Sequence, residues 1–278
     1  ARPELAAAHD VRVIASLLTP KSAPRLQHEA VTGLAKIGDR QSYQYLFAYW
    51  NGYSPTIRSK VVDVLLNKPL WTKTLLEKIQ TGSIPAAHIN LTQRQRLLKH
   101  DDPAVRELAE TALAGTIDAD RQRVIQQHQD VLSLDAETAR GKAVFELRCA
   151  ACHRLDGVGH QVGSDLATLT NPTRSSLLVA ILDPNRAVED RFLQYDIETT
   201  DGRILLGVIK DESSNSLVIT SPDGKNHTVL RSEIEQLRAS TQSLMPEGLE
   251  KLMSRQDLAD VMAFIAESSP ESGSTRLE

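Results

Sequence analysis

The sequence predicts a mainly α-helical protein with two domains, the second carrying an inserted small antiparallel β-sheet or barrel. Three observations lead to this fold class. The 278 residues are 41% hydrophobic, 24% charged and only 4% aromatic, which is typical of a globular, helix-rich chain. Apolar residues recur at helical spacing through residues 1–120 and again near the C-terminus. Between about 192 and 240, short alternating runs with β-branched residues indicate strands.

A recurring unit occupies the N-terminal part of the chain. Pro24–Gly38, Pro55–Pro69 and Asp102–Gly115 each begin with a turn residue and continue with apolar residues at helical spacing. The prolines that open the first two units and Pro85 lie 31 and 30 residues apart, a period that suits stacked helical pairs. The units resemble HEAT-type repeats, which predicts a helical-repeat domain over 1–120. Such a domain is either a docking scaffold for a partner or a plain helical domain.

The remaining boundaries follow from changes of pattern. Residues 121–135 are polar and predict a connecting helix, and the second domain is expected over 136–268. Its β insertion is predicted to have tight turns at Asp201-Gly202 and Pro222-Asp223-Gly224. Ser254 is placed to cap a last helix, and residues 269–278 are expected to form a flexible tail. The expected strands are Tyr195–Thr199, Arg203–Ile209, Leu217–Thr220 and His227–Leu230.

Charge and hydropathy argue against two classes of protein. The net charge of −4, without a basic run that interleaves with aromatic residues, argues against nucleic acid as a partner. The sequence contains no apolar run of the roughly 18 residues that would cross a bilayer, so we expect no transmembrane segment. The first residues lack the basic and apolar regions of a signal peptide, so a mature or truncated chain is expected.

The two cysteines lie in the motif Cys149-Ala150-Ala151-Cys152-His153. Two thiols at this spacing on a helical turn can reach the two vinyl groups of a haem, and the adjacent histidine then lies beneath the iron. We therefore predict one covalent haem c, held through Cys149 and Cys152, with His153 as an axial iron ligand. A zinc site would need four ligands, and a thioredoxin-type dithiol has no use for the histidine, so both alternatives are disfavoured.

At this point the chain resembles class I cytochromes c. Gly141 and Phe145 precede the motif where that family crosses its first helix over its last, and Phe264 falls where the last helix offers an aromatic ring. Gly163-Ser164-Asp165-Leu166 is similar to the family's Gly-Pro-x-Leu segment, which implies haem contacts for Gly163 and Leu166. The resemblance also implies that the carbonyl of Ser164, which replaces the proline, accepts a hydrogen bond from the imidazole of His153.

The sixth ligand of the iron is expected to be Met245. This residue and Pro246 precede the last predicted helix, as the family's ligand loop does. Met253 and Met262 belong to the helical segment or its start and are expected to pack as core. His160 is the alternative ligand, although it follows His153 closely enough to stay on the proximal side. His227 lies on a predicted strand and is expected at the surface.

More specifically, residues 138–266 are similar to the haem-binding domain family named after Pirellula and Verrucomicrobium. The residues that carry this resemblance are the Cys149–His153 motif, Leu182-Asp183-Pro184-Asn185-Arg186, Asp201-Gly202-Arg203 and Ser243–Leu249. In that family an inserted sheet separates the front of the cytochrome from its ligand loop. The resemblance implies a periplasmic dehydrogenase as the electron donor and another cytochrome or a terminal oxidase as the acceptor.

Electron transfer is the function these observations predict, in a protein that is not itself an enzyme. With His153 and Met245 on the iron, both axial sites are filled and single electrons pass without a bound substrate. Because haem is attached covalently outside the cytoplasm, a periplasmic location is expected. Two alternatives remain open. The first is a gas sensor or peroxidase-like enzyme with a labile sixth ligand, and the second is a module whose helical repeats dock a partner.

Overall fold

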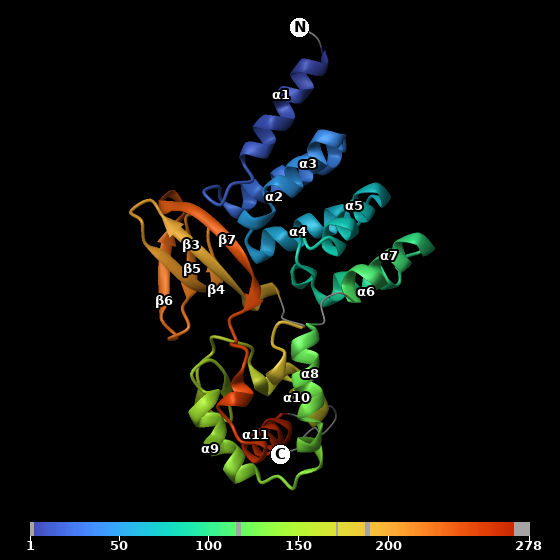
Figure 1. The fold of residues 1–278 in the computed structure, drawn as a ribbon. Helices are drawn as coiled ribbons and strands as arrows, with labels where there is room; N and C mark the ends of the chain where they lie inside the picture. Colours follow the sequence, from blue (N-terminus) through green and yellow to red (C-terminus); the bar gives the residue numbers. More distant parts are fainter. Residues whose placement is uncertain (1–2, 115–117, 171, 187–189, 270–278) are drawn as a thin grey trace, which may run out of the picture. The chain divides into compact units, whose positions relative to one another are not determined.

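The computed structural model describes residues 3–114, 118–170, 172–186 and 190–269 (Figure 1). The chain forms two compact units, each built from several stretches of sequence. The helix–sheet unit comprises residues 1–116, 189–220 and 226–242. The haem-motif unit comprises residues 117–188, 221–225 and 243–278 and contains the Cys149–His153 motif.

An array of seven α-helices makes up most of the helix–sheet unit. As the sequence predicts, α2, α4 and α7 begin at prolines, whose fixed φ suits the first helical turn. Pro85, in contrast, precedes only a 3₁₀ turn, and the following α-helix starts after Asn90, whose side chain forms a capping box with Gln93. The helices are α1 (Pro3–Ser16), α2 (Pro24–Ile37), α3 (Arg40–Ala48), α4 (Pro55–Leu65), α5 (Pro69–Gln80), α6 (Leu91–Leu98) and α7 (Pro103–Ala114), with 3₁₀ turns η1 (Trp50–Gly52) and η2 (Ala86–His88).

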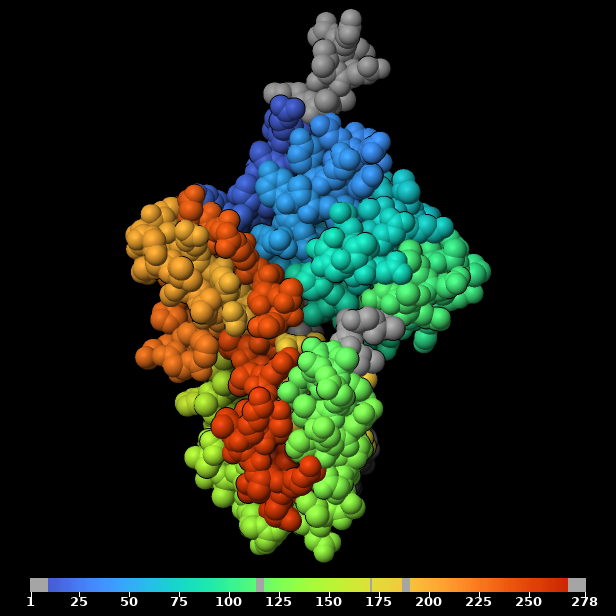
Figure 2. All heavy atoms as spheres, in the orientation of Figure 1, coloured from blue at the N-terminus to red at the C-terminus, as the bar shows by residue number. Residues whose placement is uncertain are grey.

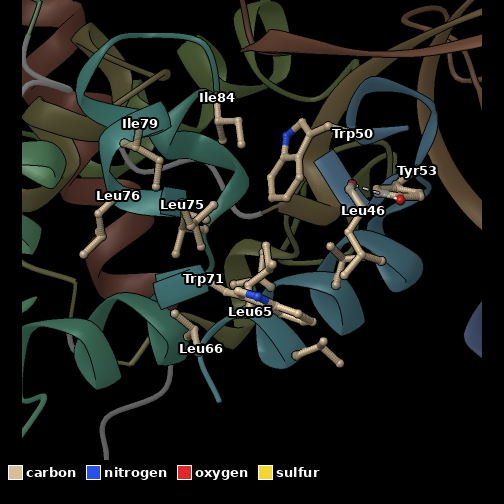
Figure 3. Packing of buried hydrophobic residues seen from close by; sticks show 14 of the residues in the cluster. Leu46, Trp50, Tyr53, Leu65, Leu66, Trp71, Leu75, Leu76, Ile79 and Ile84 are labelled. Carbon is tan, nitrogen blue, oxygen red and sulfur yellow. Dashed lines mark hydrogen bonds between the residues drawn. The ribbon is translucent and has the colours of Figure 1, made fainter. Parts of the chain in front are cut away.

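The core of this array is apolar and includes both tryptophans (Figure 3). The buried indole of Trp50 donates from Nε1 to Nδ1 of His88 at 2.9 Å, and the other ring nitrogen of His88 lies 3.2 Å from the carbonyl oxygen of Ser240. Because Nδ1 accepts and the carbonyl can only accept, His88 is a neutral imidazole with its proton on Nε2. This histidine therefore connects the helices to the sheet of the same unit.

The sheet has five antiparallel strands in the order β6-β5-β4-β3-β7. The four predicted strands are present, and Gly202 and Gly224 adopt the positive φ that their turns require. The fifth strand was not predicted, because its sequence is polar and lacks a clear alternation. Since β6 and β7 stand at the two ends of the strand order, the description that fits is a sheet rather than a closed barrel. The strands are β3 (Leu193–Thr199), β4 (Ile204–Glu212), β5 (Ser216–Thr220), β6 (Asn226–Leu230) and β7 (Ile234–Ser243), with η5 (Asp190–Phe192) and η6 (Arg231–Glu233) beside them.

The sheet packs against the helical array, and the two are in direct contact in the space-filling view (Figure 2). The hydroxyl of Tyr195 donates to the carbonyl oxygen of Tyr53 at 3.2 Å. Arg231 donates to the carbonyl oxygen of Pro20 at 2.9 Å and pairs with Glu212. This grouping differs from the expected division, which placed the sheet within the domain of 136–268. An insertion in the sequence need not join the core of the domain it interrupts, because its apolar face packs wherever a complementary surface lies.

Among the described residues of the haem-motif unit, four α-helices surround a second apolar core. Ser254 caps the last helix through a capping box with Asp257, as predicted. The segment expected as a connecting helix contributes Ile125 and Val131 to this core instead, so it belongs to the unit. The elements are α8 (Ala119–Gln127), η3 (Gln129–Ser133), α9 (Thr138–Arg148), β1 (Arg154–Leu155), β2 (Val158–Gly159), η4 (Leu166–Thr168), α10 (Arg174–Leu182), η7 (Leu249–Lys251) and α11 (Arg255–Ser268).

The predicted flexible tail, residues 269–278, begins with a residue that is packed against the core. Ser269 is buried, and its hydroxyl donates to the carbonyl oxygens of Ile265 and Leu166 at 2.8 and 3.2 Å. The rest of the expected tail, 270–278, lies outside the described residues. Among the helices that the structure describes, none is both long and apolar enough to cross a bilayer.

Candidate functional site

The position of the haem motif depends on how α9 crosses α11. A Cβ atom at Gly141 would lie 2.0 Å from the carbonyl oxygen of Asp260, so only glycine lets the two backbones approach this closely. One turn later, the buried ring of Phe145 lies 5.5 Å from the ring of Phe264. The three residues predicted at the crossing therefore meet there. Their contact places the C-terminal end of α9, which is where the motif begins.

A buried carboxylate holds the other end of α9. The side chain of Asp260 is 1% exposed and accepts hydrogen bonds from the amide of Glu137 at 2.7 Å, Nε of Arg140 at 2.7 Å and Nε2 of Gln256 at 2.9 Å. Burial acts to raise the pKa of Asp260, but these donors outweigh it, and the pKa is lowered. Asp260 is therefore ionised and ties the start of α9 to α11.

Cys149 is the C-cap of α9, and the motif that it begins forms a tight turn. The amides of Cys152 and His153 both donate to the carbonyl oxygen of Cys149, at 3.0 and 2.9 Å. The two cysteines are half-buried and are not joined in a disulfide. Burial raises the pKa of Cys149 to about 11, with Cys152 adding to the effect, and burial also raises the pKa of Cys152. Both groups are thus neutral thiols near pH 7, unlike the low-pKa cysteine of a dithiol enzyme.

The imidazole of His153 is oriented by a backbone carbonyl. Its Nδ1 donates to the carbonyl oxygen of Ser164 at 2.9 Å, so the hydrogen bond expected at this position is present. The ring lies against Gly163, where a Cβ atom would come within 2.7 Å of Cε1. Burial lowers the pKa of His153, although the bond to Ser164 acts in the opposite direction. A neutral ring that carries its proton on Nδ1 leaves Nε2 as the nitrogen able to bind a metal.

Backbone hydrogen bonds hold the loop that follows His153. The amides of Val162 and Gly163 donate to the carbonyl oxygen of Cys152 at 3.0 and 2.8 Å. Gly159, with φ of +92°, passes so close to the motif that a Cβ atom would lie 2.1 Å from the carbonyl oxygen of His153. Leu166 begins η4 and is half-buried against the core. The loop is thereby fixed by backbone bonds, with serine rather than proline at position 164.

Met245 packs on the same apolar cluster as the motif. It is half-buried, and the cluster also includes Cys149, Leu166 and Met253 at its partly exposed edge. The amide of Met245 donates to Oγ of Ser243 at 3.1 Å. Met262 is fully buried, which confirms it as core, whereas Met253 is only half-buried. Met245 and Met253 are thus the methionines near the surface of this cluster.

Of the two histidines considered as ligands, one lies beside the motif and the other belongs to the helix–sheet unit. His160 is exposed directly after β2, and its amide donates to the carbonyl oxygen of Ala150 at 2.9 Å. This bond places the backbone of His160 beside the motif. His227 is a half-buried residue of β6, in the helix–sheet unit.

A buried ion pair that the sequence did not indicate supports the segment after Met245. Arg121 donates from Nε to the carbonyl oxygen of Leu182 at 2.6 Å and pairs with both oxygens of Glu250 at 3.2 and 3.1 Å. The two side chains are only 10% and 8% exposed. The bond to Glu250 raises the pKa of Arg121. Burial acts to raise the pKa of Glu250, but the hydrogen bond from Arg121 keeps this pKa below its usual value. Both groups are therefore charged.

The residues around the motif fit a haem c. Covalent attachment requires two thiols on one turn, and Cys149 and Cys152 supply them. Iron ligation requires a histidine with a free Nε2, which the Nδ1–H bond of His153 leaves available. Burial of the porphyrin requires apolar surface, which the partly exposed apolar side chains of the cluster provide. Within the described parts of the chain, no group of three or more His, Cys, Asp or Glu side chains is placed to hold a metal ion.

One comparison with known proteins bears on this site. The family model described as cytochrome c matches residues 138–192, which run from the start of α9 through the motif and α10 to η5. No curated protein is similar enough to the chain to count as a match. The match to cytochrome c, over the stretch that carries Cys149, Cys152 and His153, supports a c-type cytochrome domain with haem c and a role in electron transfer.

Proposed function

We propose that the protein carries single electrons through one haem c, attached by thioether bonds to Cys149 and Cys152, with His153 and Met245 as axial ligands. When bound, the haem supplies an iron that alternates between ferric and ferrous states. The observation that carries this proposal is the 2.9 Å bond from Nδ1 of His153 to the carbonyl oxygen of Ser164, because it keeps the proton on Nδ1 and leaves Nε2 able to bind iron.

The surrounding residues support electron transfer rather than substrate chemistry. Gly163 lets the imidazole of His153 approach the loop closely, and Leu166 adds apolar surface to the cluster beside the motif. The thioether of Met245 is the soft ligand that would fill the opposite axial position and raise the reduction potential above that of a bis-histidine site. By resemblance to its families, the protein would take electrons from a periplasmic dehydrogenase and pass them to another cytochrome or a terminal oxidase in the periplasm.

Optical spectra of the protein with covalent haem test the ligands. We expect a low-spin spectrum with a band from methionine bound to ferric iron, and no change when carbon monoxide is added to the reduced protein. Met245→Ala should lose the band and bind carbon monoxide, whereas Met253→Ala, on the same apolar cluster, should keep the band. A high-spin spectrum or ready gas binding by the unaltered protein would favour a sensor or peroxidase-like enzyme instead.

A further inference from the structure

The side chain of Asn185 joins the turn after α10 to the segment that carries Met245. Its Oδ1 accepts a hydrogen bond from the amide of Ser243 at 2.7 Å. Its Nδ2 donates to Oε1 of Glu247 at 2.5 Å. Ser243 and Glu247 stand two residues before and two residues after Met245, so one amide group contacts both sides of it.

The segment that Asn185 contacts has little regular structure of its own. β7 ends at Ser243 and η7 begins at Leu249, and the described residues between them form neither helix nor strand. A segment of this kind depends on side-chain bonds for its position. The bond from the amide of Met245 to Oγ of Ser243 then transmits the position of Ser243 to Met245 itself.

The turn after α10, which carries Asn185, is itself held by hydrogen bonds. α10 ends at Leu182, whose carbonyl oxygen accepts from Nε of Arg121 at 2.6 Å. The amide of Asp183 donates back to the carbonyl oxygen of Val179 at 2.8 Å, and Asp183 is 2% exposed. These bonds hold the turn that carries Asn185 in place. From this turn, the side-chain amide of Asn185 accepts one hydrogen bond from the Met245 segment and donates one to it.

We infer that Asn185 is a positioning residue that sets where the thioether of Met245 lies relative to the haem motif. This inference rests on the proposed ligation of iron by Met245. It also accounts for the residue type, because a carboxylate could accept from the amide of Ser243 but could not donate to Glu247, and the two negative charges would repel. Alanine would lose both bonds.

The test uses the full chain with covalent haem and compares Asn185→Ala and Asn185→Asp with the unaltered protein. Three quantities are measured: the band of methionine on ferric iron, the affinity for added imidazole, which competes with Met245 for the iron, and hydrogen exchange of the peptide that spans 243–249. We expect a weaker band in both variants. Imidazole binding should be about tenfold tighter and exchange about tenfold faster in Asn185→Asp, the effect of losing about one hydrogen bond's net contribution, and both changes should be larger in Asn185→Ala, which loses two bonds.

Two further variants separate this effect from a general loss of stability. Arg255→Ala removes bonds from Arg255 to Gln127 and Asp130 at the surface of the same unit and should change none of the three quantities. Glu247→Ala removes one of the two bonds of Asn185 at an exposed residue and should give a smaller shift in the same direction. If Asn185→Ala fails to fold, Glu247→Ala alone decides the matter.

The outcomes distinguish the inference from the proposed function. If Met245→Ala abolishes the band while the variants of Asn185 and Glu247 behave like Arg255→Ala, Asn185 does not position the ligand and the inference falls alone. If Met245→Ala leaves both the band and the imidazole affinity unchanged, the ligand assignment is wrong and the inference falls with it.

Discussion

The segments that carry His153 and Met245, the two proposed ligands of the iron, are held in different ways; they are called the His153 side and the Met245 side below. On the His153 side, backbone groups hold the loop: amides of Val162 and Gly163 donate to the carbonyl of Cys152, and the carbonyl of Ser164 orients the imidazole. On the Met245 side, the contacts come from side chains, among them Asn185. Backbone bonds survive most substitutions, whereas side-chain bonds depend on residue type. The His153 side should therefore tolerate change except at its glycines, and the Met245 side should respond to single polar substitutions.

The largest effect is expected from Arg121→Ala, which breaks the buried pair that supports the Met245 side. Glu250 would be left as an uncompensated buried charge, so the free energy of unfolding should fall by about 3–5 kcal/mol. Urea denaturation of the haem-loaded protein measures this change. Arg123→Ala is the matched control, because Arg123 lies on the same helix in an ion pair whose side chains are 71% and 79% exposed, and it should cost about 0–1 kcal/mol. Equal losses in the two variants would contradict the assignment of a structural role to the buried pair.

Gly163→Ala tests the one kind of position at which the His153 side should be sensitive. The added methyl group would meet the imidazole at 2.7 Å, and overpacking of this kind costs about 1–3 kcal/mol. We also expect a changed low-spin spectrum, because the ring must move. Ser164→Ala, next in sequence, keeps the carbonyl that His153 uses and should be close to neutral. A spectrum altered by Ser164→Ala as much as by Gly163→Ala would disprove the claim that backbone groups determine this side.

The helix–sheet unit differs from the segments of His153 and Met245 because it contains His88, a buried histidine that should make its stability depend on pH. Burial, with Arg58 nearby, lowers the pKa of His88 to about 3, whereas in the unfolded chain it is about 6.5. The unfolded chain thus takes up a proton first, so stability is present above pH 6.5 and is lost as pH falls toward 3. We expect the unit to be about 2 kcal/mol less stable at pH 5 than at pH 7.

Tryptophan fluorescence measures this loss, because both tryptophans of the chain, Trp50 and Trp71, lie in the helix–sheet unit. The urea midpoint should fall between pH 7 and pH 5. In His88→Gln, whose amide oxygen can still accept from Trp50 but does not titrate, the dependence should flatten. An unchanged slope in that variant would assign the effect to other groups.

The smallest effect is expected from Ser243→Ala. It removes only the acceptor for the amide of Met245, and one such bond contributes about 0.5–1.5 kcal/mol. The bond from Asn185 goes to the backbone amide of Ser243, so it remains. Imidazole binding should tighten slightly, by less than in Asn185→Ala. A larger change than in Asn185→Ala would show that Ser243 is the main support of the segment.

The fold could be predicted where local signals and packing agree. Proline at the first helical turn located α2, α4 and α7, and Ser254 located the start of α11. The unit to which the sheet belongs could not be predicted, because the deciding contacts join residues far apart in sequence, such as Tyr53 and Tyr195. Local periodicity contains no information about such pairs.

The site shows the same limit. Cysteine spacing and the adjacent histidine located the motif, and Gly141, Phe145 and Phe264 were named for the contact they make. Arg121 was interpreted only as part of a polar connecting helix. Nothing near it in the sequence points to Glu250, because the buried pair forms between residues 129 positions apart. Asn185 was named only as part of a segment that resembles a known family, and no role was assigned to it.

The crossing of α9 and α11 has a consequence for biogenesis. Arg140 and Asp260, which join the two helices, lie 120 residues apart, and the whole sheet is synthesised between them. During synthesis Cys149 and Cys152 therefore emerge long before the helix that completes their surroundings. Until α11 has been made, Cys149 and Cys152 lie on a chain whose core is still open, and the last helix then closes the core over one face of α9.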